Sequence, residues 1–126
     1  SDGDALIHAL CDALLGAAAL DDIGTHFPDN DPSLKNIDST ILLKKVVEIL
    51  HTQGFQIQNM DASILLERPK LAPFVPLIRQ SLSKLLEIEE TRISIKAKTN
   101  EKMGFVGREE GIAVYVVVMI KKSYER

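Results

Sequence analysis

Three stretches of the chain place their apolar residues at helical spacing. The first is residues 5–15, and the opening Ser1 to Asp4 resembles a capping box, with a hydroxyl and a carboxylate for the free amides of a helix start. The second is residues 38–54, which begins on an aspartate suited to an N-cap and ends on a glycine. The third is residues 73–86, with two prolines where a helix begins. The pattern therefore predicts three helices.

Three further stretches have the spacing of β-strands. Residues 55–66 are strand-like up to a charged break at Glu67 and Arg68. Residues 93–97 alternate apolar and polar positions, which is typical of a strand with one face in water. Residues 112–120 form an unbroken apolar run, which predicts a strand buried on both faces. Together with the helices, these strands predict an α/β or α+β layer fold.

Composition narrows the class of protein. The chain has 126 residues, of which 45% are hydrophobic, so we expect one folded domain and not a disordered segment. Its single cysteine, Cys11, excludes an internal disulfide and indicates a reducing compartment. A net charge of −3 removes the bulk attraction on which non-specific nucleic-acid binding depends. The longest apolar run has nine residues, too few to span a membrane, and no export signal is evident.

Asp4, His8 and Asp12 form the first cluster of candidate functional residues. They are spaced four residues apart, so a helix places all three on one face. An imidazole is a common ligand for a divalent metal, and nearby carboxylates can orient it or share the ion. A solvated polar stripe opposite the core is the alternative interpretation, and the spacing alone leaves both open.

An acidic connector follows the first helix, made of Asp21 to Gly24 and the loop of residues 27–32. Asx turns and helix-ending prolines explain most of this composition. It also resembles a calcium loop, but the spaced ligands and terminal glutamate of an EF-hand are absent. We interpret His26 in this stretch as a turn residue, and His51 at the end of the second helix as a complement to the helix dipole.

Two more clusters follow predicted strand ends, where layered sheets often bind ligands. Residues 67–70 lead into a helix begun by proline, where backbone amides and Lys70 can meet a phosphate. Residues 98–108 combine a hydroxyl, an amide, a carboxylate and cations. Glu101 in this stretch can hold magnesium, which prefers hard oxygen ligands. A solvated hairpin loop with glycines at its turns explains the stretch equally well.

Six segments, taken together and in this order, resemble the 2-C-methyl-D-erythritol 2,4-cyclodiphosphate synthase family along the whole chain. Each segment alone has little specificity, whereas the combination is highly specific. The segments are Ser1-Asp-Gly-Asp-x-x-x-His8, Asp12-Ala-Leu-Leu-Gly-Ala-Ala, Asp22-Ile-Gly24, Phe27-Pro-Asp-x-Asp-Pro32, Arg68-Pro-Lys70 and Thr99-Asn-Glu-Lys-x-Gly-Phe-x-Gly-Arg108.

The resemblance implies a fold and an activity. The fold is α+β, with a mixed β-sheet, helices packed on one face and a single domain over residues 1–126, in a homotrimer with sheets around a central axis. The activity converts 4-diphosphocytidyl-2-C-methyl-D-erythritol 2-phosphate into the 2,4-cyclodiphosphate and CMP, in the methylerythritol phosphate route to isoprenoids. The substrate's own 2-phosphate is the nucleophile, which agrees with the lack of an evident Ser-His-Asp or Cys-His set. The expected location is the bacterial cytoplasm or a plastid-type organelle.

The resemblance also implies metal and catalytic residues. His8 would be a zinc ligand, Glu101 would hold magnesium or manganese with the nucleotide phosphates, and Thr99 would steady the transition state. The residues implied to bind substrate or ligand are Ser1, Asp22, Ile23, Gly24, Phe27, Pro28, Asp29, Asn30, Asp31, Leu66, Glu67, Arg68, Pro69, Lys70, Leu71, Ala72, Lys98, Asn100, Phe105 and Arg108.

These residues fall into three groups by role. Residues 22–24 and 27–31 would hold the methylerythritol part of the substrate. Residues 66–72 would form the cytidine pocket, largely through backbone groups, with their lysine near phosphate. Phe105 and Arg108 would line a cavity on the trimer axis, where the arginine can bind an anionic terpenoid or a phosphate.

Two departures from the family pattern affect this interpretation. The family's other zinc ligands, an Asp-x-His pair on a first strand, are absent, and we expect the complete protein to carry that strand before Ser1. Lys98 stands where many members have threonine, although a lysine there can still face phosphate. The alternative function is therefore a non-catalytic trimeric module that binds a nucleotide or an isoprenoid and has lost its metal site.

Overall fold

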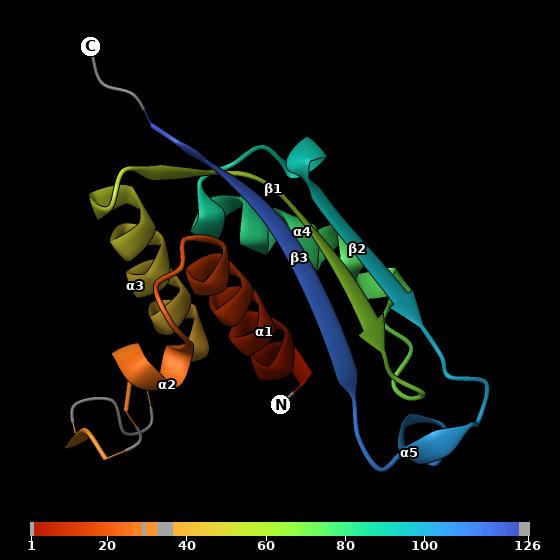
Figure 1. The fold of residues 1–126 in the computed structure, drawn as a ribbon. Helices are drawn as coiled ribbons and strands as arrows, with labels where there is room; N and C mark the ends of the chain where they lie inside the picture. The colour runs from red at the N-terminus through yellow and green to blue at the C-terminus, as the bar shows by residue number, and fades with distance from the viewer. Residues whose placement is uncertain (1, 29, 33–36, 124–126) are drawn as a thin grey trace.

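Three helices cover one face of a three-stranded β-sheet in the computed structural model, which describes residues 2–28, 30–32 and 37–123 (Figure 1). The helices are α1 (Asp2–Ala17), α3 (Ser39–Thr52) and α4 (Val75–Leu86). The strands are β1 (Phe55–Leu65), β2 (Ile93–Lys98) and β3 (Ala113–Lys122). The short elements are α2 (Ile23–His26), η2 (Ala72–Phe74), η3 (Glu90–Arg92) and α5 (Gly104–Gly107). The predicted single-domain α+β fold with a mixed sheet is confirmed.

The sheet has the strand order β2-β1-β3, so the first strand of the three lies in the middle. β1 runs parallel to β2, with α4 in the connection between them, and antiparallel to β3. A register shift between Ile57 and Asn59 marks a bulge in β1. Leu65 and Lys98, the last residues of β1 and β2, are paired. Because the two strands are parallel, both therefore end at the same edge of the sheet.

Local sequence signals set the boundaries of α3 as predicted. The predicted helix of residues 73–86 is η2 followed by α4, and the cap expected at Ser1 lies outside the described residues. Asp38 caps α3, and its side chain accepts a hydrogen bond from the backbone N–H of Thr40 at 2.8 Å. Gly54 follows α3 with a φ of 85°, a left-handed conformation in which glycine carries no side-chain clash. Proline stands in the first turns of both η2 and α4. Sequence spacing did not predict α2 and α5, because a single helical turn is too short to show a period.

The hydrophobic core lies between the helices and the sheet. α1 contributes Leu10, Leu14 and Leu15, which have no exposed surface, and β1 contributes alternating positions such as Met60 and Ala62. Cys11 is buried among them, and burial raises the pKa of its thiol to about 12. The thiol is therefore inert near neutral pH. In the part of the chain that the structure describes, no helix is both long and apolar enough to cross a membrane.

The prediction that the last strand is buried on both faces is wrong for this chain. β3 alternates: Val116 and Val118 face the helices, whereas Tyr115, Val117 and Met119 are 65%, 72% and 62% exposed. The run is apolar on both faces, but only one face has helices to cover it. An apolar strand face that the chain itself leaves open is typical of a surface that packs against another molecule.

Candidate active site

Two loops at one edge of the sheet enclose a small cavity. One loop follows β1 and the other follows β2, and they meet because parallel strands end at the same edge. The cavity has a volume of about 140 Å³. It is lined by Ile64, Leu66, Lys70, Leu71, Ala72, Ala97, Lys98 and Thr99. The structure thus brings together the two predicted clusters that follow strand ends, although they lie far apart in sequence.

Three contacts tie these two loops to each other or to the segment that follows them. The backbone N–H of Leu66 donates to the carbonyl of Lys98 at 3.0 Å. The backbone N–H of Asn100 donates to the Glu67 carboxylate, with 3.1 Å between N and Oε2. Arg68, which precedes Pro69 across a cis peptide bond, pairs with Glu109 at 3.0 Å between Nε and Oε1. Glu67, Arg68 and Pro69 are not among the residues that line the cavity.

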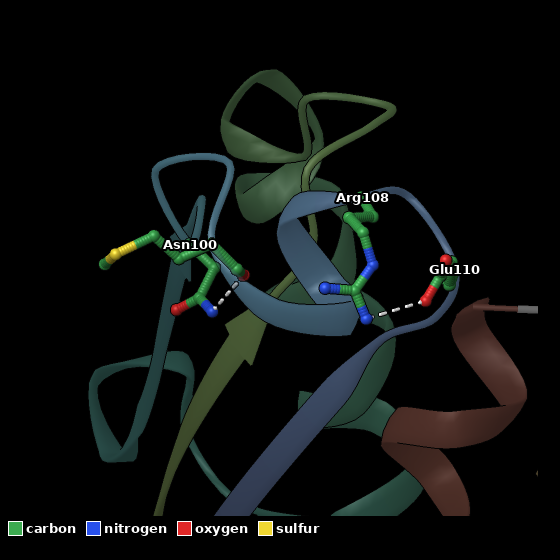
Figure 2. A network of polar contacts seen from close by, with 4 residues as sticks. Asn100, Arg108 and Glu110 are labelled. Carbon is green, nitrogen blue, oxygen red and sulfur yellow. Dashed lines mark hydrogen bonds and ion pairs between the residues drawn. The ribbon is translucent and has the colours of Figure 1, made fainter.

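A tight turn after β2 carries the predicted magnesium ligand. The backbone N–H of Met103 donates to the carbonyl of Asn100 at 2.9 Å, and the Asn100 side-chain amide donates to the carbonyl of Met103 at 2.8 Å (Figure 2). The two central residues, Glu101 and Lys102, have φ values of 52° and 64°. For residues other than glycine this left-handed conformation costs about 1–2 kcal/mol each. Such strain persists only where surrounding contacts over-determine it.

Gly107 provides one of those contacts from the other side of the turn. A Cβ atom at this position would overlap the backbone of Lys102. Only glycine therefore allows α5 to lie this close to the turn. Thr99 provides another contact, since its hydroxyl oxygen accepts the backbone N–H of Glu101 at 3.4 Å. The Glu101 carboxylate is exposed, and none of the residues described by the structure forms an ion pair with it.

Lys98 lines the cavity, but its side chain follows the alternation of β2. Ser94, Lys96 and Lys98 are exposed on the face of the sheet that carries no helices, while Ile93 and Ile95 face the core. The Lys96 ammonium lies 2.9 Å from the Asp61 carboxylate on the same face. The hydrogen bond from Lys96 is the main cause that lowers the pKa of Asp61, and the charge of Lys98 adds to it.

The carboxylates of the first predicted cluster do not converge on a metal. Asp4 accepts a hydrogen bond from the Ser39 hydroxyl, which lowers the pKa of Asp4, and Asp12 accepts the backbone N–H of Ile23 at 2.9 Å. His8 lies exposed on the surface of α1. Within the described ranges no group of three or more His, Cys, Asp or Glu side chains is placed to hold an ion. Both carboxylates thus serve as hydrogen-bond acceptors that hold neighbouring segments to α1.

The connector after α1 is built around Asp22. Its carboxylate caps α2 by accepting the backbone N–H and the hydroxyl of Thr25, both at 2.9 Å, and these bonds lower the pKa of Asp22. Ile23 and Gly24 lie in the first turn of α2. In the loop that follows, the backbone N–H of Asp31 donates to the carbonyl of Pro28 at 3.1 Å, and Asn30 is exposed. Ser1 and Asp29, both predicted to bind substrate, lie outside the described residues.

Phe27 lies against α3, whereas His26 makes its contact within the connector. Phe27 is half-buried and lines an open cavity of about 380 Å³ together with residues of α3. The His26 ring lies against the carbonyl of Leu20, and the residue is the last of α2 and not part of a turn as predicted. His51, in the last turn of α3, lies 3.9 Å from the Glu87 carboxylate. Neither histidine lines the cavity between the strand ends.

The predicted substrate residues therefore form two separate groups within one chain. α2 lies beside α1 and α3, whereas α5 lies past the ends of β1 and β2 (Figure 1). No residue of the connector lines the small cavity.

The last part of the site is the segment around α5. Phe105 is 52% exposed, and its ring lies close to Gly111. The Arg108 guanidinium pairs with Glu110 at 3.1 Å (Figure 2). Sequence reasoning missed Glu109 and Glu110, although two acidic residues directly after a basic residue are a visible signal for ion pairing. It also missed Gly107, whose close approach to the turn has no sequence signal beyond the glycine itself.

Comparisons with known proteins point to one family. A family model described as the YgbB family matches residues 1–121. The curated 2-C-methyl-D-erythritol 2,4-cyclodiphosphate synthase of Bacteroides fragilis is 57% identical over 122 residues, which are 97% of this chain and 77% of the relative. A similar enzyme from Thioalkalivibrio sulfidiphilus is 54% identical over 121 residues, covering 96% of this chain and 76% of the relative.

Solved structures agree with these sequence relatives. The bifunctional IspDF from Campylobacter jejuni superposes with a TM-score of 0.89 at 42% identity, over 94% of this chain and 32% of that longer one. A CDP complex of IspF from Plasmodium falciparum superposes with a TM-score of 0.84 at 29% identity, over 95% of this chain and 72% of the other.

Proposed function

The chain belongs to the YgbB family, and from this premise we infer that it catalyses the reaction of its relatives, 2-C-methyl-D-erythritol 2,4-cyclodiphosphate synthesis. In this reaction the 2-phosphate of 4-diphosphocytidyl-2-C-methyl-D-erythritol 2-phosphate attacks the β-phosphorus, and CMP leaves. The product is a precursor in isoprenoid biosynthesis. The alternative, a non-catalytic binding module, draws no support from relatives that are named as synthases at more than half sequence identity.

The observation that carries the assignment of the site is the cavity between the strand-end loops. Its volume of about 140 Å³ is well below that of a drug-sized site, which holds roughly 300 Å³ or more, so it suits one small ring. Leu66, Leu71 and Ala72 give it apolar walls, and their backbone groups would contact the ring. A relative of the same fold is described in complex with CDP. We assign the cavity to the cytosine of the substrate.

The phosphates would then lie toward Lys70 and Thr99, which line the same cavity. The lysine neutralises negative charge, and the threonine hydroxyl donates to a phosphate oxygen as charge shifts toward the leaving group. Asn100 and Glu101 hold the turn that brings Thr99 to this position. Because the nucleophile is part of the substrate, the protein mainly positions the two phosphates and excludes water.

Magnesium or manganese fits the exposed carboxylate of Glu101. Such ions are commonly bound by one or two carboxylates together with substrate phosphates, and Glu101 is free of ion pairs within the described residues. When bound, the ion neutralises charge on the phosphates of the leaving nucleotide. The described residues do not complete a zinc site, since no three of their His, Cys, Asp or Glu side chains are placed to hold an ion. His8 remains our prediction for one zinc ligand, and the roles proposed for Lys70, Thr99 and Glu101 do not depend on zinc.

The homotrimer is part of the proposal. Tyr115, Val117 and Met119 form an exposed apolar row on β3, on the face of the sheet that carries no helix. The connector around Asp22 and the strand-end loops lie on different sides of one chain (Figure 1). Packing of the open sheet faces around an axis would cover the apolar row and place the connector of one chain near the strand-end loops of its neighbour.

Phe105 and Arg108 would then line the axis at the end of the assembly. The guanidinium is exposed and shares its charge with Glu110 at 3.1 Å. An isoprenoid or phosphate ligand at this position would compete with the glutamate for the arginine.

Nucleotide binding and turnover test the proposed function. CDP or CMP should bind more tightly than ADP or AMP in calorimetry, because a purine is too large for the cavity. Addition of the diphosphocytidyl substrate with magnesium should release CMP, which chromatography detects. Equal affinity for ADP and CDP would argue against the assigned pocket, and a protein that binds CDP without releasing CMP would support the non-catalytic module.

A further inference from the structure

The contact between Glu67 and Asn100 joins the two loops of the proposed active site through one side chain. Glu67 follows β1, and its carboxylate accepts the backbone N–H of Asn100 at 3.1 Å. Both residues are half-buried, so the bond is partly shielded from water. A carboxylate that accepts a backbone N–H makes a stronger bond than a neutral acceptor. Asn100 is also the first residue of the strained turn that carries Glu101.

The side chain of Glu67 is directed at the second loop and not into the cavity. Leu66 and Lys70, its neighbours in the same loop, line the cavity, whereas Glu67 does not. Its effect on a bound nucleotide would therefore pass through the turn. This differs from its expected role as one of the residues that contact the substrate.

The turn needs external support because its own sequence does not favour it. Glu101 and Lys102 both have left-handed backbone conformations, although neither is glycine. The bonds between Asn100 and Met103 close the turn from within, and Gly107 supports its far side. The bond from Glu67 holds the backbone N–H of Asn100, the first residue of the turn, in place. Without it, the turn would be free to relax toward ordinary backbone angles.

We propose that Glu67 is a positioning residue, which holds the turn of residues 100–103 in the conformation that presents Thr99 and Glu101 to the substrate phosphates. This inference rests on the proposed function. Its chemistry requires a hydrogen-bond acceptor at Glu67 and does not require a charge. A glutamine should therefore replace the glutamate, whereas a side chain without an acceptor should not.

The test compares Glu67→Ala with Glu67→Gln in the full chain. We expect Glu67→Ala to lower kcat at least tenfold, while CDP affinity in the absence of magnesium changes less than twofold. Glu67→Gln should restore kcat to within about threefold of the parent. Amide hydrogen exchange of residues 99–104 should be faster in the alanine variant and not in the glutamine variant. Glu67→Met, which keeps the length without a strong acceptor, repeats the comparison if the alanine variant does not fold.

Glu89→Ala is the matched control. Glu89 is also a glutamate of a connecting segment, and it pairs with Arg92 just before β2, away from the turn. Its loss should leave kcat and the exchange of residues 99–104 unchanged. A Glu67→Ala protein with parental kcat would overturn the positioning role, as would a loss of CDP affinity equal to the loss of kcat, which indicates direct nucleotide contact. A parent protein that releases no CMP would instead overturn the proposed function.

Discussion

The carboxylate of Asp12 accepts the backbone N–H of Ile23, with 2.9 Å between Oδ1 and N, and so fastens the connector before α2 to the surface of α1. The neighbouring Asp22 carboxylate caps α2 through Thr25. These two bonds give the connector a defined shape although it contains only one helical turn. The segment proposed to hold the methylerythritol part is thus set by α1.

Asp12→Ala tests this attachment. We expect a loss of at most about 1 kcal/mol in the free energy of unfolding, because the bond is exposed and a typical hydrogen bond contributes 0.5–1.5 kcal/mol. KM for the substrate should rise severalfold, since the connector loses its anchor. Urea denaturation and steady-state kinetics measure the two effects. Asp12→Asn retains an acceptor oxygen and should behave like the parent, so equal defects in both variants would contradict the explanation.

Glu101→Gln tests the proposed magnesium ligand. The change keeps the shape of the side chain and removes its charge, so it should affect the transition state more than recognition of the base. We expect kcat to fall on the order of a hundredfold, as for other electrostatic catalytic groups, with CDP affinity without magnesium little altered. The matched Glu89→Gln change should have no effect. Turnover of the Glu101→Gln protein within a fewfold of the parent would show that the turn serves only the fold.

Much of the fold follows from local chemistry that is visible in the sequence. Asp38 and Gly54 bound α3 as predicted, because a capping carboxylate and a left-handed glycine act over a few residues. The burial of β3 was not predictable in this way. Val117 is as apolar as Val116, and only the positions of the helices decide which of them is covered.

In the candidate site, too, local features were predictable and contacts between distant segments were not. Chain order suggested that residues 66–72 and 98–101 follow strand ends, but the contact between Glu67 and Asn100 depends on the parallel pairing of two strands. Helical spacing placed Asp4 and Asp12 on one face correctly. It did not reveal that Ser39 and Ile23 donate hydrogen bonds to them, because those partners come from segments far along the chain.

Val117→Lys tests the proposed packing of the open sheet face. Val117 is 72% exposed in the single chain, so the substitution should cost the isolated fold little. Asp61, the cross-strand neighbour of position 117, is already paired with Lys96. In a trimer the lysine would therefore bring a further charge into an apolar contact, which is costly. We expect sedimentation to give the mass of one chain for the variant and of three for the parent. Gln80→Lys on α4, which is exposed on the helical side, should leave the mass unchanged.

Asp61 should contribute an acid-sensitive part of the stability. The hydrogen bond from Lys96, at 2.9 Å, is the main cause that lowers the pKa of Asp61 below its usual value of 3.8. A carboxyl whose pKa is lower in the folded state stabilises the fold above its unfolded pKa, and this contribution is lost as the pH falls through the folded pKa.

The midpoint of urea unfolding, measured between pH 2 and pH 6 in steps of about 0.5 pH unit, tests this dependence. The parent should lose more stability than Asp61→Asn as the pH falls below about 4. Lys96→Met should reduce the same loss, because it removes the main cause of the lowered pKa. Parallel curves for the parent and Asp61→Asn would show that the ion pair on the open face does not contribute to stability.

The central position of β1 has a consequence for synthesis on the ribosome. Among the described elements α1 is translated before all others, yet the strand against which it packs is β3, which comes last of them (Figure 1). Until β3 has left the exit tunnel, β1 lacks its longest partner and α1 lacks the strand that covers its apolar side. Nascent chains that end before Ala113 therefore expose leucine-rich surface, which makes them clients for chaperones and targets for proteolysis until β3 is added.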